Sequence, residues 1–220
     1  MIPKIIHYIW VGSEVPEHIQ AIIDKNNDFF TEYEVKIWTE NNIPKLNTFA
    51  QRAYDEKKWA FVADYLRFVL LQKYGGIYLD TDMDVLKSLD DLLGNSFFSG
   101  WDRRGKDVYT GIIGTKAKHP YIDNIIKKYN TIEDSLYPTS PEIMTECYID
   151  YDKKETLNIL PSPYFYPLLD GEKATKDLLK DAYTNHLWHE SWRTYVPLRR
   201  MLRRVGFMKI YHFILHKLQR

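Results

Sequence analysis

The 220-residue sequence contains a single cysteine, Cys147, and no long hydrophobic run. One cysteine excludes an internal disulfide and is typical of proteins kept in a reducing compartment. Nowhere do about 18 apolar residues follow one another, so no transmembrane helix is predicted. The apolar run within residues 1–7 is too short for a signal peptide. We therefore expect a cytoplasmic protein.

Acidic residues are missing from one end of the chain, although 30 Lys and Arg balance 30 Asp and Glu overall. Residues 193–220 carry eight basic residues and no acid, which leaves 22 basic and 30 acidic residues before them, a net charge of −8. This acidic body carries no recognition motif, so we expect no nucleic-acid binding. The length suits one domain with one core, predicted over 1–192, followed by a basic tail over 193–220.

The predicted elements alternate as in an α/β protein. Between residues 58 and 74 apolar side chains recur every three or four positions, which predicts a helix, and Gly75 with Gly76 ends it. Runs rich in β-branched and aromatic residues predict strands. Strands are predicted over 4–11, 33–38, 77–79, 108–115 and 157–160, and helices over 16–30, 58–74, 121–129 and 141–148.

Two carboxylates, Asp80 and Asp82, directly follow the short strand over 77–79. The strand is predicted to continue through them, so Tyr78, Asp80 and Asp82 share one face, because side chains two apart on a strand point the same way. Adjacent carboxylates repel unless a proton or cation lies between them. Mg²⁺ or Mn²⁺ would complete its shell with phosphate oxygens and water. At the C-terminal edge of an α/β sheet, where ligands bind, this pair suits a metal-bound nucleoside diphosphate.

Other interpretations of the same carboxylates exist. An isolated Asp-x-Asp is commonly a pair of solvated acids. Asp80, Asp82 and Asp84 also match positions 1, 3 and 5 of an EF-hand, but Val85 replaces the glycine of position 6 and Asp91 the glutamate of position 12. The same three aspartates would also suit a phosphoesterase with two metal ions.

Asp64 and Arg67 lie three residues apart in the predicted helix and so share one helical face. Both are charged within the apolar stretch 59–71, where burial without a partner is costly. Their face is predicted to lie against the carboxylate edge. A surface salt bridge within the helix is the alternative.

The combined pattern is Ala63-Asp64-Tyr65-Leu66-Arg67 followed by Tyr74-Gly75-Gly76-Ile77-Tyr78-Leu79-Asp80-Thr81-Asp82. It resembles the signature of glycosyltransferase family 32, the Asp-x-Asp sugar-binding-region family, and is similar to the core of the clostridial glucosylating toxins. The likeness extends to the closing His-His-Trp-x-x-Ser-Trp segment, from which residues 186–192 differ at Leu187 and Glu190. Further similar segments are 5–12, 111–120, 159–161 and 165–167.

The resemblance implies a GT-A fold, a Rossmann-like α/β domain, and transfer with retention of anomeric configuration. It implies a nucleotide-sugar donor and Mn²⁺ or Mg²⁺, with Asp64, Arg67, Asp80 and Asp82 as candidate catalytic residues. Asp82 would be the main metal ligand, Asp80 would contact ribose, sugar or metal-bound water, and Asp64 and Arg67 would bind donor-sugar hydroxyls. No residue is identified as a nucleophile.

The remaining implied contacts come from both ends of the domain. Trp10 would stack on or flank the base, Tyr78 would touch the ribose, and His186 would be a further metal or diphosphate ligand. Ser191 and Trp192 would close over the phosphates. Alternatively, Trp10 is a core residue and His186 a surface residue.

The basic tail is amphipathic from residue 198 onward, with apolar residues on one stripe and arginines on the other. This pattern predicts a helix over 198–220 on an anionic membrane surface. A helix docked on its own domain is the alternative. We therefore predict a peripheral protein on the inner face of the cytoplasmic membrane.

The function that combines these features is transfer of a hexose from a UDP- or GDP-linked sugar to a surface glycan. The acceptor would be a lipid-linked capsule or lipopolysaccharide intermediate. Two alternatives remain: a metal-dependent phosphoesterase, or a non-catalytic module that binds nucleotide-sugar or glycan.

Overall fold

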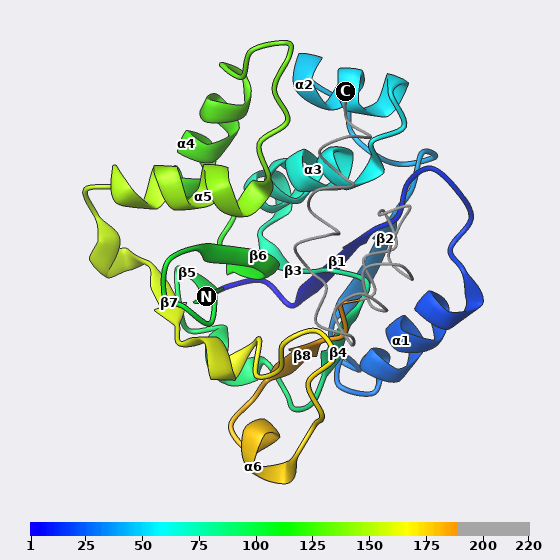
Figure 1. Ribbon diagram of the computed structural model, residues 1–220, viewed down its shortest axis with the longest axis vertical. Coiled ribbons are helices and arrows are strands. Elements are labelled where there is room, and N and C mark those ends of the chain that lie inside the picture. The colour runs from blue at the N-terminus through cyan, green and yellow to red at the C-terminus, as the bar shows by residue number, and fades with distance from the viewer. Residues whose placement is uncertain (189–220) are drawn as a thin grey trace, which may run out of the picture. The chain divides into compact units, whose positions relative to one another are not determined.

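A six-stranded sheet of order β2-β1-β3-β6-β5-β7 runs through the computed structural model, which describes residues 1–188 (Figure 1). The strands of this sheet are β1 Ile5–Ile9, β2 Glu34–Trp38, β3 Gly76–Leu79, β5 Phe97–Trp101, β6 Val108–Thr115 and β7 Asn158–Leu160. A second, two-stranded sheet pairs β4 Met83–Val85 with β8 Thr184–His186. The helices are α1 Glu17–Asn27, α2 Thr48–Asp55, α3 Trp59–Tyr74, α4 Pro120–Tyr129, α5 Ser140–Ile149 and α6 Lys176–Leu179, with 3₁₀ turns at η1 Asp90–Leu92, η2 Lys154–Thr156 and η3 Ser162–Tyr164.

Every predicted segment contains an element of the predicted type, so the α/β prediction is confirmed. β1 runs parallel to β2 and β3, whereas β6 is antiparallel to β3 and β5. The elements α2, β4, β5, α6 and β8 were not predicted.

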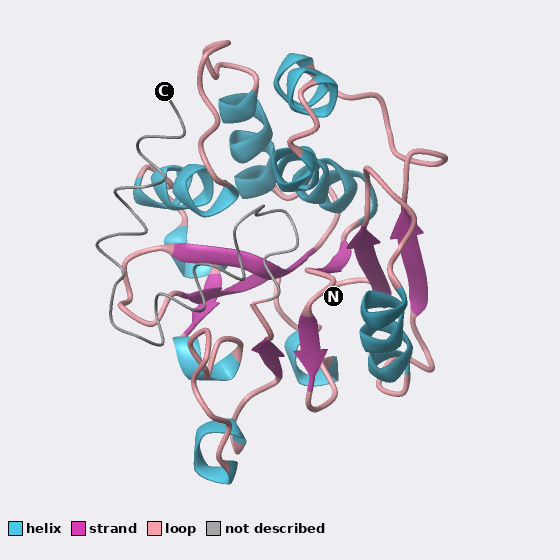
Figure 2. Ribbon diagram, turned by 45° about the vertical axis from the view of Figure 1, so that its right-hand side comes forward, coloured by secondary structure: helices cyan, strands magenta, loops and turns pink. Residues whose placement is uncertain are grey.

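Helices cover both faces of the large sheet, with α2 to α5 on one side and α1 on the other (Figures 1 and 2). The side chains of β3 alternate between the two faces of the sheet. Ile77 and Leu79 pack into the core on the α1 side, while Tyr78 between them packs into the core beside α3. All three are buried, as expected for a strand covered on both faces.

The carboxylate motif lies in a turn, so the predicted continuation of β3 through Asp80 and Asp82 is wrong. β3 ends at Leu79, and the Met83 N–H donates to the Asp80 carbonyl at 3.0 Å, which closes a four-residue turn before β4. Strand alternation therefore does not place Asp80 and Asp82 together. The turn and its neighbours do so instead.

β4 is held from both edges. On one edge β8 pairs antiparallel with it, Met83 opposite His186, and the Leu187 N–H extends the pairing to the Asp82 carbonyl at 3.0 Å. On the other edge the buried Asn26 side chain of α1 donates to the Met83 carbonyl and accepts from the Val85 N–H. The end of the motif turn and the strand that follows it are thus fixed by hydrogen bonds.

Buried His7 of β1 fixes the junction between α3 and β3. The Trp38 indole N–H can only donate, and it donates to His7 Nδ1 at 3.1 Å. The other ring nitrogen, Nε2, must then carry the proton and donate to the Gly75 carbonyl at 2.8 Å. Gly75 and Gly76 both have positive φ, and a Cβ on Gly76 would lie 2.6 Å from the Ile5 carbonyl oxygen, so this junction requires glycine.

Residues Met1–Leu187 form one compact unit. Within the described part of the chain, no helix has the length and apolar character needed to cross a membrane. The predicted domain boundary at 192, the basic segment 198–220, Ser191 and Trp192 lie outside the described residues.

Neutral His7 makes stability depend on pH. Burial lowers the pKa of His7 from 6.5 to about 4. Between pH 6.5 and pH 4 the His7 side chain is therefore protonated in the unfolded chain but neutral in the folded chain. About 3 kcal/mol of folding stability that is present above pH 6.5 is lost as the pH falls towards 4. His7→Gln should flatten this part of a urea-midpoint profile measured from pH 8 to pH 4. An unchanged slope in His7→Gln would contradict the assignment.

Candidate functional site

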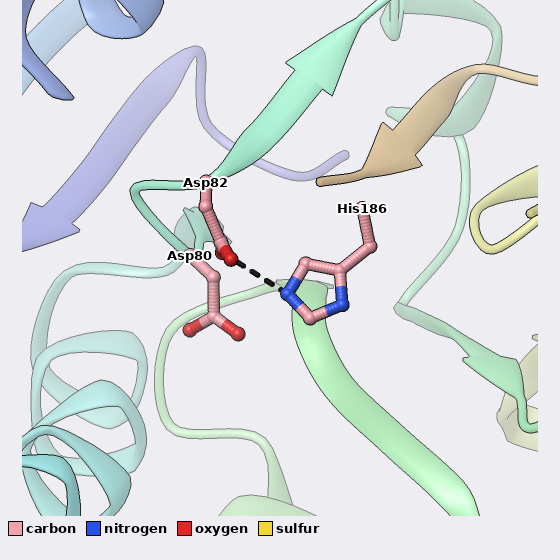
Figure 3. Close-up of side chains that lie close together, drawn as sticks. All are labelled: Asp80, Asp82 and His186. Atoms are coloured by element: carbon pink, nitrogen blue, oxygen red, sulfur yellow. Dashed lines mark hydrogen bonds and ion pairs between the residues drawn. The ribbon is translucent and has the colours of Figure 1, made fainter. Parts of the chain in front are cut away.

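The side chains of Asp80, Asp82 and His186 lie close together after β3, and Asp82 and His186 point toward each other (Figure 3). One ligand atom from each lies within 4.8 Å of the other two. His186 Nε2 is 3.0 Å from Asp82 Oδ1, across 104 residues of sequence. β8 brings the histidine here by pairing with β4, directly after the motif turn.

The three residues fit a divalent cation. Their side chains are 27%, 15% and 16% exposed, so they are accessible from solvent while held in place. Two carboxylates and an imidazole are ligands that Mn²⁺ accepts, and carboxylate oxygens are those that Mg²⁺ prefers. Two carboxylates this close repel each other unless a proton or a cation lies between them.

Arg67 of α3 is shared by two carboxylates. Its Nη2 donates to Asp64 Oδ1 at 2.6 Å, and its Nη1 lies 3.2 Å from Asp80 Oδ1. The guanidinium also lies 4.6 Å from the centre of the Tyr78 ring, whose hydroxyl donates to Asp80 Oδ1 at 2.6 Å. Both interactions thus fall on the same oxygen of Asp80, Oδ1.

Asp64 is buried beside the first residue of α5. Its Oδ1 accepts from the Ser140 hydroxyl at 2.6 Å and its Oδ2 from the Ser140 N–H at 3.1 Å. Burial raises the pKa of Asp64, while Arg67 and the two Ser140 donors oppose that rise. Burial alone would lower the pKa of Arg67, but Tyr78, Asp80 and Asp64 raise it above its ordinary value. The guanidinium therefore stays charged.

Gly111 of β6 leaves room for Asp80. A Cβ on Gly111 would lie 3.2 Å from Asp80 Oδ2 and 3.3 Å from the Tyr166 hydroxyl. The Gly111 carbonyl also accepts from the Asp80 N–H at 2.8 Å. Tyr166 itself is buried, and its ring lies edge-on to that of His186, with centroids 6.2 Å apart.

The structure brings six predicted residues together: Asp64, Arg67, Tyr78, Asp80, Asp82 and His186. The surface salt bridge between Asp64 and Arg67 is wrong, since both are buried and the pair faces Asp80. Tyr78 is 2% exposed, so in this structure it reaches the site through Asp80.

Trp10 lies just beyond β1, half-buried against the core on the α1 side. Its indole N–H donates to Ser13 Oγ and the Glu14 carbonyl. Stacking on a base stays a prediction.

Four residues of this network were not predicted: Thr110, Gly111, Ser140 and Tyr166. A signal for Ser140 exists in the sequence. Thr139 and Glu142 form a capping pair, in which the Thr139 N–H donates to Glu142 Oε2 at 2.7 Å. That pair marks a helix start, where free N–H groups attract a carboxylate.

Comparisons with known proteins agree on one family. Residues 12–98 match the model described as "Glycosyltransferase sugar-binding region containing DXD motif". A protein of Acanthamoeba polyphaga mimivirus named "Uncharacterized glycosyltransferase L373" is 30% identical, over 90% of this chain and 86% of its own length. "Inositol phosphoceramide mannosyltransferase 2" of Schizosaccharomyces pombe is 29% identical over 87% of this chain, but over only 59% of its own length. This chain therefore spans little more than half of that relative.

Among solved structures, one titled "PaToxG Glycosyltransferase" superposes with a TM-score of 0.55, at 17% identity and over 68% of each chain. At that identity the likeness shows the fold alone. The fold is GT-A, as predicted.

Gly111→Ala should weaken cation binding at Asp80. The new methyl group would push the Asp80 carboxylate aside, and we expect about tenfold weaker Mn²⁺ binding, measured by the electron paramagnetic resonance signal of free Mn²⁺. Gly94→Ala is the matched control, because a Cβ there meets no atom within 4 Å. Equal Mn²⁺ affinity in both variants would show that Asp80 does not need this space.

Proposed function

The chain belongs to the glycosyltransferase family whose sugar-binding region contains the DXD motif, and we propose that it moves a hexose from a UDP- or GDP-linked sugar to a surface-glycan acceptor. We further propose that the transfer needs Mn²⁺ or Mg²⁺ and retains the anomeric configuration. Retention is carried by the family resemblance alone.

The observation that carries the donor proposal is the cluster of Asp80, Asp82 and His186 beside the buried Arg67. A divalent cation bound there would neutralise the charge that a nucleoside diphosphate develops on leaving the sugar. Arg67 offsets the charge of Asp64, so Asp80 and Asp82 supply the net negative charge that attracts the cation.

The chain's own residues hold this geometry before any ligand arrives. Tyr78 and Arg67 fix Asp80 Oδ1, and the pairing of β8 with β4 fixes His186 against Asp82. Side chains that are already in position lose little conformational freedom when a donor binds. Their interactions are therefore available to stabilise the transition state.

The names of relatives support a hexose and a lipid acceptor. The Schizosaccharomyces pombe relative is named an inositol phosphoceramide mannosyltransferase, a name that contains a hexose, mannose, and a lipid, ceramide. We propose by extension a lipid-linked acceptor, such as a capsule or lipopolysaccharide intermediate, met at the inner face of the cytoplasmic membrane. The basic segment 198–220 would supply the membrane contact.

The phosphoesterase alternative requires Asp84 as a third carboxylate beside Asp80 and Asp82. Asp84 is paired with Lys25 at 2.5 Å, and the cluster within the described residues contains His186 in its place. A non-catalytic module would use the same cluster, so the enzyme proposal needs a measurement of transfer.

Nucleotide-dependent stabilisation tests the donor site. UDP or GDP at a hundred times its dissociation constant should add about 2.7 kcal/mol in the presence of Mn²⁺, or roughly 5–10 °C in the thermal midpoint, and nothing in its absence. Asp82→Asn should abolish both this shift and sugar transfer, because it removes a negative ligand of the cation. Asp84→Asn is the matched control and should keep the shift.

If neither UDP nor GDP raises the thermal midpoint in the presence of Mn²⁺, the donor proposal is contradicted. A Mn²⁺-dependent shift without sugar transfer or donor hydrolysis would identify a binding module instead.

Deleting residues 198–220 tests the membrane proposal. Each basic residue near an anionic surface adds about 1 kcal/mol, so the truncated chain should bind phosphatidylserine liposomes more than tenfold more weakly in a flotation assay. A variant of the 220-residue chain in which Gln replaces Arg199, Arg200, Arg203 and Arg204 tests the same basic charge without shortening the chain. Unchanged flotation of the truncated chain would contradict the proposal.

A further inference from the structure

Four buried side chains close a ring of hydrogen bonds behind the cation cluster. Arg67 of α3, Thr110 of β6, Ser140 of α5 and Asp64 of α3 are each no more than 9% exposed. Arg67 Nη1 is 3.2 Å from Thr110 Oγ1, Thr110 Oγ1 is 2.8 Å from Ser140 Oγ, and Ser140 Oγ is 2.6 Å from Asp64 Oδ1. Asp64 Oδ1 is in turn 2.6 Å from Arg67 Nη2.

The direction of every hydrogen bond in the ring follows from its end members. A charged carboxylate only accepts and a guanidinium only donates. The Ser140 hydroxyl must therefore give its proton to Asp64, so it accepts from Thr110. The Thr110 hydroxyl, having donated, accepts from Arg67. Both hydroxyl protons have one allowed orientation, and the ring has one hydrogen-bond pattern.

This pattern fixes the orientation of the Arg67 guanidinium. Both terminal nitrogens are engaged in the ring, and Nη1 also donates to the Thr110 carbonyl at 2.9 Å. The same Nη1 faces Asp80 Oδ1 at 3.2 Å. Any rotation of the guanidinium that breaks a ring bond therefore also disturbs its contact with Asp80.

We propose that Ser140 and Thr110 are positioning residues, which hold Arg67 against Asp80 and so set the affinity of the cation cluster. Both act through Arg67, to which the ring links them. The inference rests on the proposed function for the identity of the cation. It adds that α5 and β6, two elements outside the DXD segment, control how firmly the motif binds.

The position of Ser140 strengthens this control. It is the first residue of α5, and its N–H donates to Asp64 Oδ2 while its hydroxyl donates to Oδ1. A helix N-terminus favours a negative charge, so the two Ser140 donors oppose the rise in the pKa of Asp64 that burial causes, and they hold its carboxylate in one orientation. Residues in such supporting positions typically change metal affinity by 10- to 100-fold when replaced.

Mn²⁺ titration of the full chain tests the proposal, with free Mn²⁺ followed by electron paramagnetic resonance. Ser140→Ala and Thr110→Val should each weaken Mn²⁺ binding about tenfold, and the double variant should be little weaker than either, because each opens the same ring. Ser140→Thr restores a hydroxyl and should recover most of the affinity.

The matched control is Thr145→Val, also on α5. Its hydroxyl oxygen accepts from the Val108 N–H at 2.9 Å, so the change removes one hydrogen bond between α5 and β6 outside the ring. It should lower the thermal midpoint without altering Mn²⁺ affinity. If Ser140→Ala does not fold, Thr110→Val tests the ring at another point with nearly unchanged side-chain volume.

Three outcomes would overturn the proposal, and they are distinguishable. Wild-type affinity in folded Ser140→Ala and Thr110→Val, with Mn²⁺ bound by the wild type, would overturn only the positioning role. Absence of Mn²⁺ binding by the wild type would overturn the cation site of the proposed function and this inference with it. Loss of affinity in Thr145→Val equal to that in Ser140→Ala would reduce the effect to general stability and overturn the positioning role.

Discussion

The positive charge of Arg67 is the interaction on which the arrangement of the site depends. Its guanidinium lies between Asp64 on its own helix and Asp80 at the end of β3, and all three side chains are withdrawn from bulk solvent to different degrees. Without it, Asp64 would be a buried, uncompensated charge, a situation that costs about 3–5 kcal/mol. These interactions link four elements, α3, β3, β6 and α5. Each of them supplies a partner to the Arg67 guanidinium or to one of the two aspartates beside it.

Sequence reasoning found the part of this arrangement that local spacing governs. Asp64 and Arg67 are three apart on a helix, so their pairing follows from helical geometry, and the apolar residues around them indicate burial. β3 was equally predictable as a short apolar strand entered from two glycines. The sequence could also place Asp80 and Asp82 after that strand, although it gave the wrong reason for their proximity, because a turn hydrogen bond between Met83 and Asp80 competes with strand continuation.

Contacts between distant segments were not accessible to spacing or periodicity. His186 meets Asp82 across 104 residues through a strand of three residues, too short to give a periodic signal, and only the family resemblance pointed to it. Ser140 and Thr110 are common polar residues, and spacing along the sequence does not predict that they join Arg67 and Asp64 in one ring. β5 was missed for a similar reason, since its glycine and bulge interrupt the alternation that marks a strand.

The site divides into an outer part that a ligand can reach and an inner part that sets its geometry. Asp80, Asp82 and His186 retain some exposure, whereas Arg67 and Ser140 are almost fully covered. Buried polar groups are tolerated only when their hydrogen bonds are made, and the closed ring meets that condition. Tyr78 joins the two parts, since its ring contacts Arg67 inside and its hydroxyl holds Asp80 outside. The inner part therefore fixes the position of Asp80, the motif carboxylate that both Tyr78 and Arg67 contact. Asp82 is positioned by β4 and β8 instead.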